Sequence, residues 1–234
     1  MERRRFIQWC MAGAAVAPQR LPAAELQPRR YARAQLVDTR GAPLRVASLA
    51  RGTTYVFHYP YAGTPCFLID LGRPTHRNTS LSTPNGTRYS WPGGVGARRT
   101  VVAYSAICSH RMTYPTPQIS FISYREKSSA PGVAHPNTIH CCSEHSEFDP
   151  AAGGRVVAGP APEPLAAILL DYDPKTDELH ATATLGNELF NAFFAKYDVK
   201  LALDYGGRDR VRAPVGARTV VTELTEFCKQ QIRC

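Results

Sequence analysis

Two short stretches that each pair a cysteine with a histidine constrain this 234-residue chain most strongly. One residue lies between Cys108 and His110, and two residues lie between Cys142 and His145 further along the chain. A thiolate and an imidazole from each of two loops suit a binuclear iron–sulfur centre, in which two cysteines hold one iron and two histidines hold the other. The fold must then bring two segments that are distant in sequence together around one site.

A single zinc ion is the chemical alternative, because two cysteines and two histidines also satisfy tetrahedral zinc. The residues that flank the two pairs form a further pattern. A run of β-branched and apolar residues, 101–107, leads into the first pair, and Phe148 and Asp149 follow the second. The sequence Gly159-Pro160-Ala161-Pro162 comes next, in a segment rich in turn-forming residues. The ligand types alone do not distinguish iron from zinc, so the choice depends on the family that these flanks resemble.

These segments resemble the Rieske iron–sulfur proteins. Residues 101–110 are similar to the strand and first cluster loop of that family, and residues 142–149 to its second cluster loop. The loop at 159–162 is similar to one that covers the cluster in Rieske subunits of cytochrome bc and arsenite oxidase complexes. The resemblance spans roughly residues 31–185 and implies a Rieske-type [2Fe-2S] cluster. The ligands that it implies, with the serine that donates to a bridging sulfide, are Cys108, His110, Cys142, His145 and Ser146.

The second pair can be aligned with the family in two registers. Cys142 keeps the two-residue spacing to His145 and is preferred. The loop is one residue shorter after His145 than in the family, so an alignment that starts from Asp149 places Cys141 opposite the ligand cysteine instead. Replacing each cysteine by serine would decide between them.

Three positions depart from the family pattern and bear on redox chemistry. High-potential members carry a disulfide between the ligand loops, and its positions are here Thr113 and Glu144, so that bridge is expected to be absent. Phe148 stands where a tyrosine hydroxyl donates to a cysteine ligand. Hydrogen bonds to the sulfur atoms stabilise the more negative, reduced state. The sequence therefore predicts a potential below that of quinol-oxidising Rieske proteins.

The remaining pattern predicts an all-β fold, which the resemblance specifies as a Rieske-type antiparallel β-sandwich with a cluster-binding subdomain at about 104–165, plus a C-terminal helical extension. Runs of Val, Ile, Thr and Tyr predict strands, among them 44–47, 53–60 and 65–71. Residues 72–98, rich in glycine and proline, are expected to form a long surface loop. Apolar side chains recur at helical spacing at Leu189, Phe190, Phe193, Phe194 and Tyr197 and predict an amphipathic helix.

Residues 1–24 fit a twin-arginine export signal, with Arg3-Arg4-Arg5 followed by an apolar run. That run is well short of the roughly twenty residues that span a bilayer as a helix, although a retained segment would allow membrane association through the N-terminus. Residues 25–185 are expected to form the Rieske domain, and 186–234 the extension. Export of a folded protein suits a cluster that is inserted in the cytoplasm, so we expect a periplasmic location.

In an oxidising compartment, Cys228 and Cys234 are candidates for a disulfide. If residues 220–232 are helical, a spacing of six directs the two side chains differently, and Cys234 must then lie beyond the helix end. The sequence leaves this bridge open.

The formal net charge of +9 favours an acidic partner. The Lys and Arg residues are scattered without a basic stripe that alternates with aromatic residues, so nucleic acid is not expected. We expect a one-electron carrier without a substrate site of its own, an electron-transfer subunit of a respiratory or molybdenum-type oxidoreductase. Its partners would be a larger catalytic subunit or quinol-oxidising complex, and a c-type cytochrome or similar acceptor. The alternative is a zinc-stabilised, non-redox binding or scaffold subunit.

Overall fold

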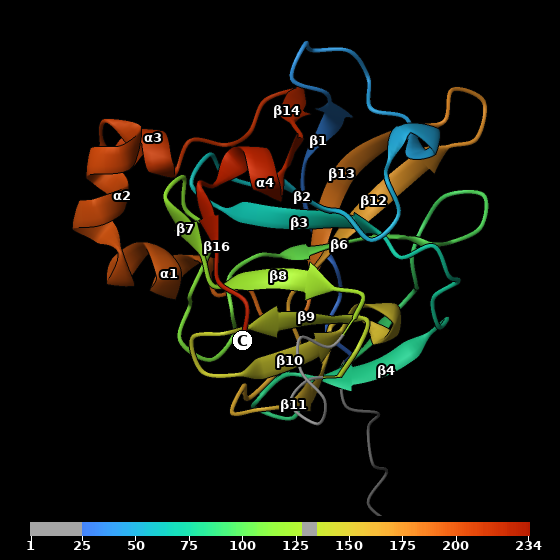
Figure 1. The fold of residues 1–234 in the computed structure, drawn as a ribbon, viewed down its shortest axis with the longest axis horizontal. Helices are drawn as coiled ribbons and strands as arrows, with labels where there is room; N and C mark the ends of the chain where they lie inside the picture. Colours follow the sequence, from blue (N-terminus) through green and yellow to red (C-terminus); the bar gives the residue numbers. More distant parts are fainter. Residues whose placement is uncertain (1–24, 128–134) are drawn as a thin grey trace, which may run out of the picture.

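The computed structural model describes residues 25–127 and 135–234, and most of its regular structure is β-strand (Figure 1). Eight strands form one large sheet, in the order β14-β1-β13-β12-β6-β3-β2-β15. Neighbouring strands are antiparallel except for β1 and β14. In spatial order the strands are Arg218–Val220, Arg29–Val37, Glu178–Leu185, Ala167–Asp173, Val101–Ser105, Pro65–Asp70, Thr54–His58 and Thr222–Glu223.

One short segment pairs with both edges of this sheet. β14 and β15 are separated only by Val221, yet β14 pairs with β1 and β15 pairs with β2. The Val221 amide donates to the Val37 carbonyl over 2.8 Å, and the Thr219 hydroxyl donates to the His58 carbonyl over 2.9 Å. The sheet therefore curls until its two edges are bridged, which makes it a near-closed barrel.

A smaller antiparallel sheet carries the second cysteine–histidine segment. Its order is β11-β10-β9-β8, and its strands are Arg155–Ala158, Ser146–Asp149, Thr138–Cys141 and Ile122–Arg125. Tyr104 of the large sheet and Ile139 and Phe148 of the small sheet are buried in the same hydrophobic core. The expected all-β fold with a smaller subdomain is thus confirmed.

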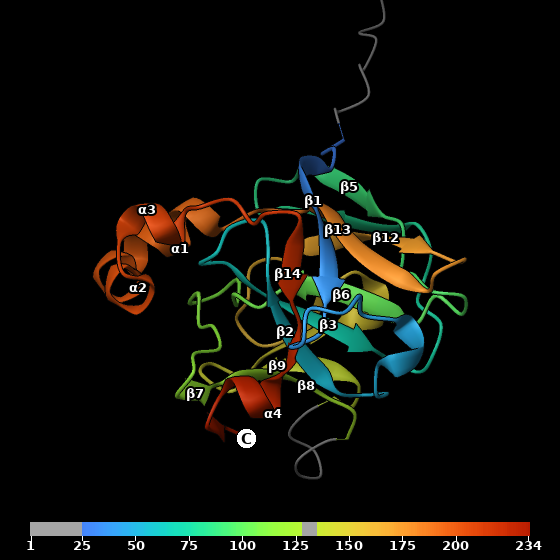
Figure 2. The same cartoon turned by 90° about the horizontal axis from the view of Figure 1, so that it is seen from above.

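The chain after β13 is partly helical, as expected. The helices α1 (Phe190–Lys196), α2 (Asp198–Tyr205) and α3 (Arg208–Val211) form a group at the side of the barrel (Figures 1 and 2). Phe190, Phe193 and Phe194 are buried and pack against Ile107 and Tyr114, which confirms the amphipathic helix. The helical group therefore supports the segment around the first cysteine–histidine pair.

The last residues add strands to the fold as well as a helix. The short helix α4 (Leu224–Phe227) is followed by β16 (Gln230–Gln231), which pairs in parallel with β7 (Ile119–Ser120). The C-terminus consequently ends beside the small sheet (Figure 1).

Two sequence predictions of local structure are wrong. Residues 72–98 contain the hairpin β4 (Thr79–Ser82) and β5 (Arg88–Trp91) rather than only a surface loop, and its side chains Leu81, Tyr89 and Trp91 are buried. The segment predicted as a strand at 44–47 gives way to a 3₁₀ turn at Val46–Ser48.

Within residues 25–127 and 135–234, no helix combines the length and apolarity that a membrane crossing requires. The expected export signal lies outside the described residues.

Candidate metal centre

The two ligand loops meet where the two sheets share their core. The first ligand loop, residues 106–113, follows β6, and the second ligand loop, residues 142–145, joins β9 to β10. Arg111 Nε of the first lies 3.6 Å from Glu144 Oε1 of the second. Because Arg111 follows His110 and Glu144 precedes His145, this ion pair places the two histidine-bearing loops in contact.

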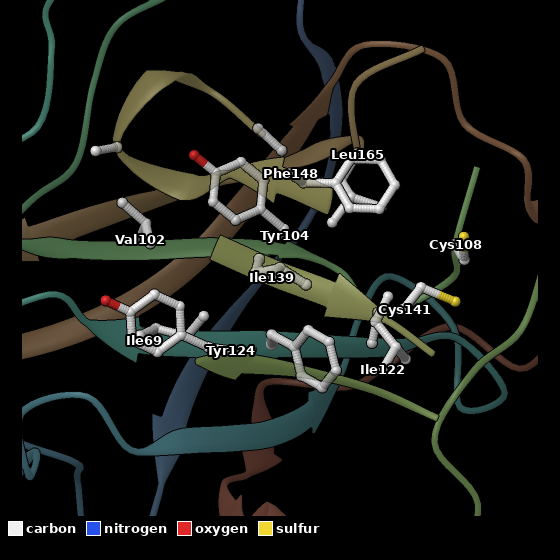
Figure 3. Close-up of a cluster of buried hydrophobic side chains, with 14 of the residues drawn as sticks. Ile69, Val102, Tyr104, Cys108, Ile122, Tyr124, Ile139, Cys141, Phe148 and Leu165 are labelled. Carbon is white, nitrogen blue, oxygen red and sulfur yellow. The ribbon is translucent and has the colours of Figure 1, made fainter. Parts of the chain in front are cut away.

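Cys108 and Cys141 form a buried pair of thiols at this meeting point (Figure 3). A hydrogen bond from the Cys141 thiol is the largest cause that lowers the pKa of Cys108 to about 7, and it raises the pKa of Cys141. The backbone amides of His110 and Arg111 and the hydroxyl of Ser146 also lower the Cys108 pKa. A thiol with a lowered pKa forms the thiolate more readily, and the thiolate is the form that binds a metal.

The preferred Cys142 is bonded to Cys234 in the structure. Cys142 forms a disulfide with Cys234, with 5.7 Å between the two Cα atoms, and an oxidised sulfur is not available as a thiolate ligand. Strand alternation explains the outcome. Ile139 and Cys141 lie on the face of β9 that enters the core, so Cys142, one residue later, is directed away from Cys108.

The same disulfide shows which partner Cys234 takes, a pairing that the sequence left open. The candidate bridge between Cys228 and Cys234 is not formed, because Cys234 lies beyond α4 and reaches Cys142 instead. Cys228 is buried and free, as is Cys66.

The histidines of the two loops differ in their surroundings. His110 is partly exposed, but its Nδ1 atom is buried and has no hydrogen-bond partner. Buried nitrogen atoms of this kind are normally satisfied, so an unpartnered one agrees with a metal-binding position, although His140 Nδ1 and His180 Nδ1 are unpartnered in the same way. His145 is exposed at the tip of the hairpin, with a φ of 56°, and its ring centroid lies 5.9 Å from that of His140.

His140 and Cys234 are close to the site, and the sequence reasoning did not find them. His140 is fully buried and its Nε2 atom lies 3.5 Å from Cys234 Sγ. One ring nitrogen each of His140 and His145 and the disulfide-bonded sulfur of Cys234 all lie within 4.8 Å of one another. The alternation of β9 could have placed His140 opposite Cys141, but no local pattern predicts that the chain end arrives there.

The turn-rich segment after β11 contacts both ligand loops. The Ser109 hydroxyl donates to the Glu163 carbonyl over 2.7 Å. Gly159 lies so close to the second ligand loop that an added Cβ would be 2.3 Å from the His145 carbonyl oxygen. This segment, the proline loop (residues 159–165), therefore holds the two loops from one side.

The donor set fits a binuclear centre better than a single zinc ion. Zinc bonds of about 2.0–2.3 Å would place all four ligand atoms within roughly 4 Å of one another. Among the described residues, the group whose possible ligand atoms lie within 4.8 Å of one another consists of His140, His145 and Cys234. This group includes neither Cys108 nor His110. A paired set of thiols with one histidine on each loop matches two irons of unlike ligation. The residues that would hold them are Cys108, Cys141, His110 and His145.

No family model matches this chain. A solved structure that is similar to it is the crystal structure of the soluble domain of the Rieske protein II (soxF) from Sulfolobus acidocaldarius. The two share 29% sequence identity over 66% of this chain and 78% of that one, with a TM-score of 0.45. At this TM-score the backbones do not superpose closely as a whole, so the function of this chain has to rest on its own residues.

Proposed function

We propose that this protein is a Rieske-type one-electron carrier. Its [2Fe-2S] cluster would be held by Cys108 and Cys141 on one iron and by His110 and His145 on the other. The observation that carries this proposal is the buried pair of thiols, Cys108 on the first ligand loop and Cys141 at the end of β9, each close in sequence to a histidine. A cluster of this type supplies reversible one-electron chemistry.

The protein's own groups determine how such a centre is held and reached. The amides of His110 and Arg111 and the Ser146 hydroxyl would donate to the Cys108 sulfur. The exposed ring of His145 offers an edge at which a redox partner can approach. Glu144 is paired with Arg111, which offsets part of the negative charge that it would otherwise bring to the site.

The reduction potential is expected to lie below that of quinol-oxidising Rieske proteins. Phe148 is fully buried among apolar side chains and provides no hydroxyl near the sulfur atoms. Fewer donors leave the reduced, more negative state less stabilised. A redox titration followed by electron paramagnetic resonance measures this directly, and a potential as high as in those proteins would contradict the expectation.

The location and partners that we propose follow from the sequence. Export by the twin-arginine route would deliver the folded protein to the periplasm, as an electron-transfer subunit of a respiratory or molybdenum-type oxidoreductase. A c-type cytochrome or similar carrier would accept the electron. The positive net charge supports an acidic docking partner.

The purified protein tests the proposed function. Iron and acid-labile sulfide in equal amounts, with a Rieske-type resonance signal after reduction, are the expected result. Cys141→Ser should abolish this signal, because it removes a sulfur ligand. A colourless protein that contains zinc and no iron would refute the carrier and leave the scaffold role.

A further inference from the structure

The C-terminal tail, residues 228–234, runs along the small sheet and ends at the second ligand loop. Three backbone amides anchor it to the segment before β8: Lys229 N to the Pro117 carbonyl over 3.0 Å, Gln230 N to the Gln118 carbonyl over 3.1 Å, and Ile232 N to the Ser120 carbonyl over 2.8 Å. The disulfide between Cys234 and Cys142 then joins the last residue to the loop. The tail is thus fixed at both of its ends.

Arg125 joins the tail and the loop a second time. Its guanidinium group donates to the Cys234 carbonyl over 2.7 Å, to the Ile232 carbonyl over 2.9 Å and to Cys142 Sγ over 2.8 Å. Arg125 is only 8% exposed and lies on β8, the strand next to β9. A planar group with several fixed donors holds these three acceptors in one arrangement.

The tail also touches the histidine side of the candidate centre. Cys234 Sγ lies 3.5 Å from His140 Nε2 and within 4.8 Å of a ring nitrogen of His145. A shift of the tail would therefore change the surroundings of a proposed iron ligand.

Direct contacts between the two ligand loops are weak compared with the disulfide and the Arg125 hydrogen bonds that join the second loop to the tail. Thr113 and Glu144 cannot form a disulfide, and the ion pair of Arg111 and Glu144 is exposed on both sides. Exposed ion pairs hold little structure because water screens them. The covalent link of Cys142 to Cys234 spans 92 residues, and cross-links over long separations restrict the unfolded chain most.

We propose that the tail is a clamp that holds the second ligand loop in its cluster-binding conformation, with the Cys142–Cys234 disulfide and Arg125 as its two fastenings. This proposal rests on the proposed function, and it assigns Cys142 a positioning role in place of iron ligation. Cys142 faces the tail because strand alternation directs Cys141 toward Cys108.

Four single serine variants and one double variant test the clamp in the full chain. Cys142→Ser and Cys234→Ser should each retain the cluster but lose it several-fold faster during incubation with an iron chelator, and the double variant should lose it no faster than either. Residues that act as one unit show this non-additivity. Cys141→Ser should lack the cluster altogether. Cys228→Ser is the matched control, because it removes a free buried thiol from the same tail.

Two further readouts separate positioning from general stability. Hydrogen exchange of the apo-protein should show lower protection of the second ligand loop in Cys142→Ser and Cys234→Ser, with the barrel strands unchanged. The resonance g-values of the reduced cluster should shift equally in these two variants and stay unchanged in Cys228→Ser.

The outcomes that would overturn the proposals are distinct. If the unaltered protein contains no iron–sulfur cluster, the proposed function fails and the clamp fails with it. If Cys142→Ser abolishes the cluster while Cys141→Ser retains it, Cys142 is the ligand, and the clamp fails while the function stands. If Cys234→Ser matches the unaltered protein in cluster loss, exchange and g-values, the clamp also fails.

Discussion

The Ser146 hydroxyl is fully buried and has no hydrogen-bond partner at ordinary distances, but it lies close enough to Cys108 to lower the pKa of that thiol. We expect Ser146→Ala to keep the cluster but to lower its reduction potential, because a donor to sulfur stabilises the reduced state. A loss on the order of 1 kcal/mol corresponds to roughly 40 mV for one electron. Ser143→Ala is the control, since Ser143 is in the same loop but exposed. Equal potentials in a redox titration of the two variants would contradict this role.

The buried side chain of His58 predicts how the stability of the folded protein depends on pH. Burial lowers the pKa of His58 to about 4, and Tyr205 Oη lies 3.2 Å from its Nε2 atom. The unfolded chain binds a proton below about pH 6.5, whereas the folded chain does so only near pH 4. The free energy of unfolding should therefore fall as the pH drops through this window, by about 1–2 kcal/mol between pH 7 and 5. In His58→Gln, the free energy of unfolding measured in urea should not show this fall with pH. If the free energy of unfolding falls with pH equally in His58→Gln and in the unaltered protein, His58 is not the cause.

The proposed ligand residues show how far single positions could be predicted. Cys108 and His110 could be recognised from spacing and flanks, and the structure places both in the first ligand loop. The choice between Cys141 and Cys142 could not be made from spacing, because the shortened turn fits both. It depends on which face of β9 enters the core, and that is set by the pairing of Cys141 with Ser146 and of Ile139 with Phe148. A one-residue change of register turns every side chain to the opposite face.

At the scale of elements, the proline loop provides a sharp test. Gly159 has a φ of +82°, and an added Cβ would lie 2.3 Å from the His145 carbonyl oxygen. Gly159→Ala should push the proline loop away from the second ligand loop, destabilise the protein by more than the ~1 kcal/mol backbone cost and speed cluster loss. Gly41→Ala carries the same φ of +82° with no atom within 4 Å, so it isolates the backbone cost. Equal unfolding free energies in urea for the two variants would show that the contact does not matter.

The hairpin of β4 and β5 was missed because glycines and prolines around it obscured a weaker signal. Leu81, Tyr89 and Trp91 are buried at alternating positions, on either side of a turn that contains Asn85 and Gly86. Alternation around Asn-Gly is itself a hairpin pattern. The composition of the whole segment therefore outweighed information that was present in its centre.

At the scale of the whole molecule, the arrangements that no local pattern predicts are those made by the C-terminal segment. Val221 bridges the edges of the barrel, and Cys234 bonds to a residue 92 positions earlier. Such contacts depend on where the rest of the chain has already placed its partners, so residues 186–234 could be predicted as helical but not as a source of strands and a cross-link. The repeated aromatic residues of α1 were recognisable because helical spacing is local.

The net charge of +9 supports a prediction for the molecule as a redox partner. The net charge stays positive when residues 1–24 are left out, because they contain four arginines and one glutamate. The second-order rate of electron transfer to an acidic carrier protein should therefore fall as the ionic strength rises, because the Debye length shrinks from about 30 Å at 0.01 M to about 3 Å at 1 M. Stopped-flow mixing measures this, with a basic carrier of similar potential as the control, for which the rate should rise. Rates to the acidic carrier that do not change with salt would show that the positive charge does not guide docking.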